Sequence, residues 1–286
     1  MAKMNHCVIM TVYTDLHQVN KFISTMPENW DVYVHVDNKS NINVNDIDSR
    51  AHVLKIYDVY WGSFNHLLAF WKMIEIAYYK KDYDYFHLVS GQDFWSKSLV
   101  EVKQIIEEGK IYLDVVFDPM WYDGGYEIYA YATLAPLCDI RKPFWGIVNR
   151  LLRRIQDFLN LKKRKPNYTL YGGSVYCSLT KEAVEECFRS YIAKDLLSKL
   201  KYSSIGEEIF FQTILMNSRL KSKIINNSLR YVDWSCEVRP KVLKEEDYNK
   251  IVDSKTIFCR KVDSAKSKEL LNKLYNYYDF NNNTSL

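Results

Sequence analysis

The chain has 286 residues, of which 48% are hydrophobic and 26% charged, and its formal net charge is +4. This composition is ordinary for a soluble globular protein, and the charge is too small to indicate a nucleic-acid-binding protein. Glycine and proline are scarce and no fixed-period repeat occurs, which excludes long low-complexity linkers and repeat architectures. We expect one compact domain over residues 1–279 and a flexible tail over 280–286.

The first residues and the cysteines bear on the compartment. Residues 1–13 lack the charged-then-apolar pattern of a signal peptide, and no apolar run approaches the ~18 residues of a membrane span. The six cysteines include no CxxC pair, and most stand in apolar segments, which is typical of reduced core residues. We therefore expect a cytoplasmic protein.

Strand and helix patterns alternate through the N-terminal half. Helical spacing predicts helices behind Asp15, over Ser63–Tyr79 and behind Ser98, which forms a capping box with Glu101. The alternation predicts an α/β fold with a Rossmann-type, mainly parallel sheet flanked by helices. Apolar runs predict its strands at His6–Tyr13, Asp31–Val36, Val53–Tyr57, Tyr85–Ser90 and Ile111–Phe117.

The ends of these strands mark the expected ligand site. Ligands bind mainly parallel sheets beyond the carboxyl ends of their strands. Asp37 follows the second predicted strand, and the Gly91–Asp93 turn follows the fourth. Both segments are therefore candidate parts of a binding site.

Residues 143–166 differ in character, because a helical apolar face is combined with a cluster of cations. Between residues 144 and 165 there are seven positive charges against the single acid Asp157. Such a helix usually packs its apolar face on the domain and leaves its basic face in solvent. The alternative is an amphipathic helix that lies in a membrane interface through residues 144–165.

The C-terminal part predicts one interrupted strand and three helices. Tyr168–Ser178 has a strand pattern broken by two glycines, and Thr180 caps a helix that runs to about Lys199. Glu207–Met216 and Asp263–Tyr278 are predicted to be the last two helices.

Two short segments carry residues suited to group transfer. Glu207 and Glu208 stand at the start of an apolar helix, where the helix dipole favours negative charge. For either acid alone, that electrostatic role is the simpler explanation. Arg260 and Lys261 end an apolar run, and two cations there could neutralise a leaving diphosphate without a metal. A surface ion pair with Asp263 is the alternative.

Metal-binding patterns are weak. The six histidines are scattered without ligand spacing. Asp82 and Asp84 form an acidic pair of the kind that holds divalent cations, but they precede their strand and so lie at its wrong end. We predict no metal site and no other cofactor.

Seven short pieces of the chain stand in an order that is hard to obtain by chance. They are Val34–Ser40, Val59–Ser63, His87–Phe94, Gly172–Tyr176, Glu207–Thr213, Val232–Trp234 and Ile257–Asp263. Together they resemble glycosyltransferase family 14, the core-2/I-branching β-1,6-N-acetylglucosaminyltransferases and their xylosyltransferase relatives. The resemblance spans roughly residues 6–265 and implies a GT-A-like domain. The family's animal members carry a membrane anchor and disulfides that are absent here, so the chain resembles a bacterial member.

The resemblance implies roles for individual residues. The family's catalytic acid stands five residues before a threonine, so Thr213 selects Glu208 rather than Glu207. Lys261 matches the lysine that contacts the donor diphosphate. For the second cation, Arg239 fits the family's spacing, whereas alignment on Pro240 nominates Lys241. Other donor-binding candidates are Arg260, Asp37 and Trp61, and the acceptor-binding candidates are Trp234, Glu127 and Asp93.

The implied function is an inverting, metal-independent transfer of a sugar, GlcNAc by preference, from a UDP-sugar to a hydroxyl group. The acceptor would be a glycan or lipid-linked glycan in bacterial surface polysaccharide or glycan synthesis, at the inner face of the plasma membrane. UDP-xylose is the alternative donor. A non-catalytic sugar- or nucleotide-binding homologue is the alternative class, and the presence of both Glu208 and Lys261 argues against it.

Overall fold

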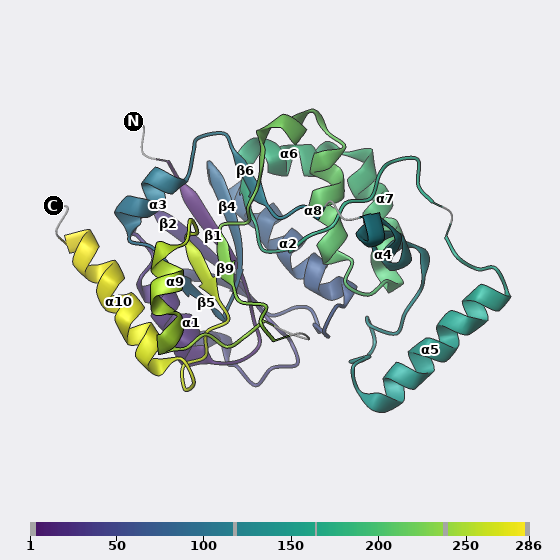
Figure 1. The fold of residues 1–286 in the computed structure, drawn as a ribbon, viewed down its shortest axis with the longest axis horizontal. Coiled ribbons are helices and arrows are strands. Elements are labelled where there is room, and N and C mark those ends of the chain that lie inside the picture. The colour runs from purple at the N-terminus through teal and green to yellow at the C-terminus, as the bar shows by residue number, and fades with distance from the viewer. Residues whose placement is uncertain (1–3, 117–118, 164, 237–239, 284–286) are drawn as a thin grey trace.

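The computed structural model describes residues 4–116, 119–163, 165–236 and 240–283. Its central element is a sheet with the strand order β3-β2-β1-β4-β7-β6-β8 (Figure 1). Neighbours are parallel except at β7, which is antiparallel to β4 and β6. The predicted α/β fold with a mainly parallel sheet is confirmed. The strands are β1 (His6–Val12), β2 (Trp30–Val36), β3 (Ala51–Leu54), β4 (Tyr85–Ser90), β6 (Ile111–Leu113), β7 (Ser178–Thr180) and β8 (Ile224–Asn226).

Helices cover both faces of this sheet. Along β1, Cys7 and Ile9 pack into one hydrophobic cluster, whereas Val8 and Met10 pack into another. Burial on both faces explains the continuous apolar run, since such a strand has no polar side. The first face carries α2 (Phe64–Lys80), α6 (Lys181–Arg189), α7 (Tyr191–Lys199) and α8 (Glu207–Met216), and the second carries α1 (Leu16–Ser24), α3 (Leu99–Ile105), α9 (Tyr248–Asp253) and α10 (Lys268–Asn283).

A smaller sheet packs in the second cluster, in the order β5-β10-β9. Arg230 of this sheet is buried, and its guanidinium donates to the carbonyl oxygens of Leu88 and Cys177, each at 2.8 Å. Because Leu88 belongs to β4, these bonds tie the small sheet to the large one. They also satisfy a charge that would be expensive to bury alone. The strands are β5 (Asp93–Trp95), β9 (Arg230–Val232) and β10 (Phe258–Arg260).

Three predicted helix starts are confirmed by their caps. The side chain of Asp15 accepts a backbone hydrogen bond at the start of α1. Ser98 and Glu101 form both bonds of the capping box that opens α3. Thr180 caps α6. These polar side chains satisfy amide groups that have no partner within the helix.

Some predicted boundaries are wrong. The third strand is Ala51–Leu54 instead of Val53–Tyr57. No regular strand is described over residues 168–177, where a single bridge joins Gly172 to Val116. The helix expected from residue 180 to 199 is two helices, because Ser190 ends α6 and caps α7.

The C-terminal helix also differs from the prediction. α10 begins at Lys268 and continues to Asn283, so residues 280–283 of the expected tail are helical. Residues 284–286 lie outside the described part of the chain. Short 3-10 helices are η1 (Val44–Asp46), η2 (Leu200–Tyr202), η3 (Arg219–Lys223) and η4 (Glu245–Asp247).

Two further helices, α4 (Pro119–Ala130) and α5 (Pro143–Phe158), lie on the side of α8 that is away from the sheet (Figure 1). The sequence patterns did not predict α4, whereas α5 falls within the predicted insertion. Figure 1 shows α5 set apart from the body of the molecule. Of the helices described, none is both long and apolar enough to span a bilayer.

Candidate active site

Gln212 and Thr213, in the second half of α8, bond to the segment over residues 171–174. Thr213 Oγ1 donates to the Tyr171 carbonyl oxygen at 3.0 Å and accepts from the Tyr171 amide at 3.0 Å. Gln212 Nε2 donates to the Ser174 carbonyl oxygen at 2.7 Å. The glutamine and threonine of this motif are therefore structural residues, and they hold residues 171–174 against the helix that carries Glu208.

Gly173 is needed for the same contact. Its amide donates to the Glu208 carbonyl oxygen at 2.9 Å. A Cβ atom at this position would stand 1.9 Å from the Asp114 carbonyl oxygen, which no side chain could tolerate. Gly173 thus lets its segment lie against the Asp114 backbone while its amide bonds to the first turn of α8.

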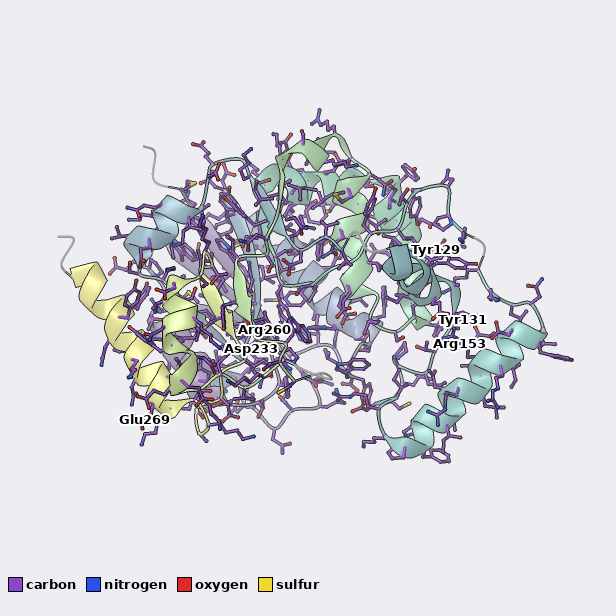
Figure 2. All side chains as sticks on the ribbon, viewed as in Figure 1. Tyr129, Tyr131, Arg153, Asp233, Arg260 and Glu269 are labelled. Atoms are coloured by element: carbon purple, nitrogen blue, oxygen red, sulfur yellow. The ribbon has the colours of Figure 1, made fainter. Side chains whose placement is uncertain are left out.

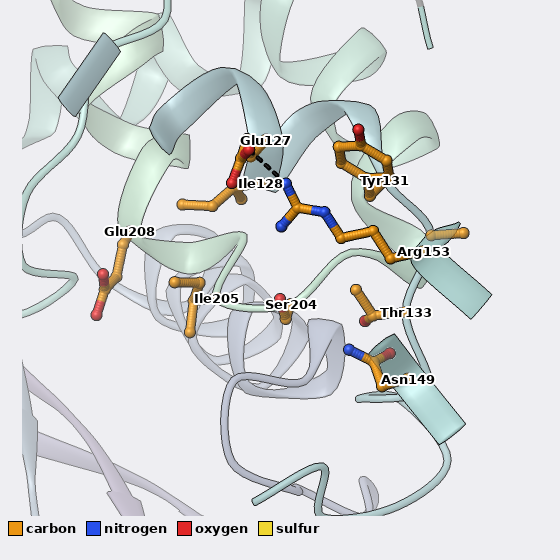
Figure 3. Close-up of a pocket in the computed structure, with 10 residues that line it drawn as sticks. Glu127, Ile128, Tyr131, Thr133, Asn149, Arg153, Ser204, Ile205 and Glu208 are labelled. Atoms are coloured by element: carbon orange, nitrogen blue, oxygen red, sulfur yellow. Dashed lines mark hydrogen bonds and ion pairs between the residues drawn. The ribbon is translucent and has the colours of Figure 1, made fainter. Parts of the chain in front are cut away.

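Glu208 lines a cavity of ≈ 360 Å³ between α8, α4 and α5 (Figure 3). Across the cavity Arg153 of α5 is ion-paired with Glu127 of α4, and its guanidinium lies 4.5 Å from the centre of the Tyr131 ring. Figure 2 shows Tyr131 and Arg153 close together on the α5 side of the molecule. The other lining residues are Ile128, Ala132, Thr133, Asn149, Ser204 and Ile205.

The pKa of Glu208 is raised from 4.5 to about 7. Burial is the main cause, because it disfavours the charged carboxylate, and the neighbouring Glu207 carboxylate adds repulsion. A carboxylate with a pKa near neutrality can accept a proton during a reaction and still be substantially deprotonated beforehand. Glu208 therefore has the environment that a general base requires.

Glu207 is positioned differently from Glu208. Only 5% of Glu207 is exposed, and its Oε1 lies 3.2 Å from His66 Nδ1. The other ring nitrogen of His66 lies 3.4 Å from Thr11 Oγ1 at the end of β1. Glu207 is thus directed toward the sheet, whereas Glu208 faces the cavity, which supports choosing Glu208 of the two acids.

Arg260 and Asp93 form a buried ion pair, with Arg260 Nε 3.3 Å from Asp93 Oδ1. The same carboxylate accepts from Ser90 Oγ at 2.8 Å, and the guanidinium lies 3.5 Å from the centre of the Tyr176 ring. Asp93 has no exposed surface and Arg260 has 7%. Each charge faces the other within the protein, so direct contact of Asp93 with the acceptor and of Arg260 with the donor stays a prediction.

Tyr176 interacts with charged residues at the end of β10 and at the start of α8. Burial raises its pKa, the Arg260 guanidinium lowers it, and the carboxylates of Asp93 and Glu207 raise it further. Tyr176 is therefore within electrostatic range of both the end of β10 and the start of α8. Sequence motifs that are far apart in the chain meet in this region.

Asp37 lies at the end of β2, as predicted, and is 9% exposed. Lys39 Nζ lies 2.8 Å from both of its carboxylate oxygens, and the Val59 amide donates to Oδ1 at 3.1 Å. The carboxylate is thus neutralised and holds the loop that leads to Trp61. Any contact with a nucleotide would use the small exposed part of this group.

The two lysines expected near the donor diphosphate belong to neighbouring segments. The Lys261 amide donates to the Lys241 carbonyl oxygen at 3.4 Å. Lys241 Nζ, however, lies 2.8 Å from Asp247 and 3.3 Å from Glu246. The side chain of Lys241 is therefore committed to two carboxylates of η4. Arg239, the alternative, lies outside the described residues.

The family model of the Core-2/I-branching enzymes matches residues 7–252. This span includes all of β1 except His6, and the whole of β4 and α8. The chain belongs to the Core-2/I-branching enzyme family. The resemblance inferred from the ordered motifs is therefore confirmed at the level of the family.

Curated relatives of this Core-2/I-branching family member include two xylosyltransferases. Human xylosyltransferase 1 is 26% identical over 132 residues, which cover 39% of this chain and 14% of the relative. Rat xylosyltransferase 2 is 28% identical over 121 residues, which cover 35% of this chain and 14% of the relative. The chain thus spans about a seventh of the length of these relatives.

Two solved structures show a weaker likeness to this family member. S. aureus TarS residues 1–349 give a TM-score of 0.37 at 12% identity, covering 77% of this chain and 57% of that one. The apo WbbM bifunctional glycosyltransferase gives 0.39 at 11% identity, covering 90% and 46%. Both TM-scores are below 0.5, so the assignment rests on the family model.

The two tryptophans nominated in the Core-2/I-branching motifs are exposed at different places. Trp61 is 49% exposed, and the Arg141 guanidinium lies 5.2 Å from its ring centre. The next residue, Gly62, accepts from the Ile205 amide at 2.6 Å, which brings the Trp61 loop to the turn before Glu208. Trp234 is 65% exposed, so its ring is accessible to a ligand.

Sequence reasoning missed the part of this family member's cavity that α5 provides. Arg153 and Asn149 line the cavity, but in the sequence they belong to a basic amphipathic pattern that gives no sign of a site. The sequence predicts Glu127 as an acceptor-binding residue, but it does not predict the ion pair of Glu127 with Arg153. Within the described part of the chain no three His, Cys, Asp or Glu side chains are grouped as a metal site. Metal independence stays a prediction.

Proposed function

We propose that this protein is an inverting, metal-independent glycosyltransferase that forms a β-linkage from a UDP-sugar, with GlcNAc as the preferred donor sugar. The acceptor is a hydroxyl group of a glycan or lipid-linked glycan, in surface polysaccharide or glycan synthesis on the cytoplasmic side. The observation that carries the proposal is Glu208, a carboxylate with a pKa of about 7 that lines a cavity at the start of α8.

In the proposed reaction Glu208 removes the proton from the acceptor hydroxyl. The oxygen forms a bond to the anomeric carbon of the donor while the bond from that carbon to the diphosphate oxygen breaks. UDP leaves with the electron pair, and attack from the opposite face converts an α-linked donor into a β-glycoside. General-base assistance of this kind is worth about 10²–10⁴-fold in rate.

Cations meet the charge that develops on UDP. We assign this role to Lys261 and Arg239, because these two residues match the family's diphosphate-binding cations. The side chains of Lys241 and Arg260 face the carboxylates of Asp247 and Asp93. Arg260 and Asp93 then act as positioning residues that fix the end of β10 beside Ser90. Asp37, Trp61 and Trp234 remain candidates for contact with the nucleotide and the acceptor. Glu127 is a candidate acceptor ligand because it lies in the cavity of Glu208.

A β-xylosyltransferase is the second candidate, favoured by the xylosyltransferases among the curated relatives. UDP-xylose and UDP-GlcNAc differ at C2 and C6 of the sugar, and no residue named above distinguishes them. Membrane contact through residues 144–165 completes the proposed set of partners, and nucleic acid is not among them.

A panel of UDP-sugars tests the proposal. Thermal shift identifies the donor, because a ligand that binds only the folded state raises its stability. We expect one UDP-sugar to raise Tm, to be slowly hydrolysed and to give a β-linked product by NMR. Activity should survive EDTA. An α-linked product would overturn the inverting mechanism, strict dependence on Mn²⁺ would overturn metal independence, and no response to any UDP-sugar would overturn the function.

A further inference from the structure

Helix α5 presents an apolar stripe to solvent. Phe144, Ile147, Leu151, Ile155 and Phe158 recur every three or four residues and therefore share one side of the helix. Their exposed fractions are 65, 58, 55, 44 and 89%, respectively. The expectation that the helix packs its apolar face on the domain is wrong. Large contiguous apolar surfaces of this kind mark interaction sites in soluble proteins.

The polar side of α5 faces the protein instead. Gln156, the one buried residue described in α5, accepts from the Ala132 amide and donates to the Ala132 carbonyl oxygen, both at 2.9 Å. Asn149 Oδ1 accepts from the Leu134 amide at 3.1 Å, and Arg153 is paired with Glu127. These contacts fix the orientation of the helix. Because they lie on its polar side, the apolar stripe on the opposite side points into solvent. A surface helix normally has the reverse arrangement.

The charge around the stripe indicates what covers it. Arg150 and Arg154 are exposed one turn apart and flank the stripe. Lys162 and Lys165 follow the helix and are also exposed. Asp157, the only acid of α5, is already bound by Tyr131 and Lys162. A second copy docked through this stripe would gather the arginines of both chains, whereas an anionic lipid surface would complement them.

We propose that α5 is an interfacial helix that docks the protein on an anionic lipid bilayer. The stripe enters the boundary between headgroups and acyl chains, and Arg150 and Arg154 meet lipid phosphates. Sixteen residues give a helix about 24 Å long, which can lie flat in this boundary. Apolar burial and attraction to anionic headgroups both contribute to such binding.

Docking would also orient the active site. Asn149 and Arg153, on the protein-facing side of α5, line the cavity of Glu208 (Figure 3). A docked helix therefore holds this cavity within one helix diameter of the bilayer surface, where lipid-linked acceptors display their glycans. This consequence for the acceptor rests on the proposed transferase activity, whereas the docking itself does not depend on that activity.

Sedimentation with extruded vesicles tests the docking without donor or acceptor. We expect the protein to bind phosphatidylcholine vesicles containing 30% phosphatidylglycerol, and to bind pure phosphatidylcholine at least tenfold more weakly. Leu151→Ser/Ile155→Ser/Phe158→Ser should reduce binding at least tenfold. The matched control Tyr79→Ser/Tyr191→Ser, which removes exposed rings from α2 and α7, should bind normally. Arg150→Gln/Arg154→Gln should lower both the affinity and its sensitivity to salt.

The outcomes separate docking from catalysis. Glu208→Gln should bind vesicles like the wild type, so a failure of the proposed transferase leaves this result intact. Equal vesicle binding by the wild type and the triple variant would overturn the proposal. Light scattering could instead show that the wild type is an oligomer, that the triple variant is a monomer and that the wild type does not bind vesicles. The stripe would then be an interface between two copies of the chain, which would also overturn the proposal. Circular dichroism melting confirms that each variant is folded.

Discussion

Helices α8 and α5 both line the cavity of Glu208, but different forces hold them in place. In α8 every residue except Glu208 is buried, and apolar side chains surround the helix. In α5 Gln156 is the single buried residue described, and polar contacts attach the helix to the loop over residues 131–134. The base is therefore held by the hydrophobic core, whereas the opposite wall of the cavity is held by hydrogen bonds and an ion pair.

The two helices therefore differ in how much their contacts contribute to stability. Burial of large apolar side chains contributes about 1.5–3 kcal/mol each, so α8 cannot move without disrupting the core. The half-exposed Arg153–Glu127 ion pair contributes about 0–1 kcal/mol. Helix α5 is therefore held mainly by the hydrogen bonds of Gln156 and Asn149, and it contributes less to stability than α8.

The largest expected effect compares two phenylalanines. Phe211→Ala in α8, where the ring is 1% exposed, should lower the free energy of unfolding by about 3–5 kcal/mol, because it leaves a cavity in the core. Phe158→Ala in α5, where the ring is 89% exposed, should change it by less than about 0.5 kcal/mol. Urea denaturation measures both, and equal losses would break the comparison.

Next in size is the contact that anchors α8. Thr213→Val keeps the shape of the side chain but leaves the amide and carbonyl groups of Tyr171 without their partner. We expect a loss of about 1–3 kcal/mol. Thr213→Ser retains the hydroxyl and serves as the control. If denaturation gave the same free energy of unfolding for the valine and serine variants, Thr213 would not anchor the helix.

A smaller effect concerns the pH dependence of catalysis. Because Glu208 must be deprotonated to act as a base, kcat/KM should rise with pH through about 7. About 10% of the carboxylate is charged one unit below its pKa. Glu207→Gln removes a repelling charge and should therefore lower the pKa of Glu208 and shift the rise of kcat/KM to lower pH. If kcat/KM of this variant rose at the same pH as that of the wild type, Glu207 would not influence the base.

The smallest expected effect lies on the α5 side. Arg153→Gln breaks a pair whose side chains are 46% and 50% exposed, so the free energy of unfolding should fall by less than about 1 kcal/mol. If the wall contacts the acceptor, KM for the acceptor rises while hydrolysis of the donor is unchanged. A large loss of stability would show that α5 is held more rigidly than we infer.

Much of the fold could be predicted from the sequence, because local chemistry determined it. The observed bounds of β4 and α8 match those predicted, since continuous apolar runs end at polar residues there. β5 was missed because a strand of three residues, Asp93–Trp95, depends on pairing with distant β10. That pairing also creates the Arg260–Asp93 ion pair, which the sequence patterns did not predict.

The orientation of α5 could not be predicted for a related reason. The spacing of Ile147, Leu151 and Ile155 shows that an apolar side exists, but it does not show which side faces the protein. That choice depends on the hydrogen bonds of Gln156 and Asn149 to the loop over residues 132–134.

Stability against pH provides a control for the base. Since the pKa of Glu208 is raised in the folded state, its protonated form favours folding below pH 4.5, and this contribution is lost as pH rises through about 7. Glu208→Gln removes the titrating carboxylate. Relative to the wild type, the variant should therefore gain in Tm between pH 5 and pH 8. No relative gain would show that Glu208 is not desolvated.

The rate of sugar transfer by Glu208→Gln at pH 8, with UDP binding measured in parallel by calorimetry, tests the central claim most directly. We predict that transfer falls by about 10²–10⁴-fold, while UDP binds with nearly unchanged affinity and Glu207→Gln remains active. A Glu208→Gln enzyme that turns over within a few-fold of the wild type would contradict the assignment of the base.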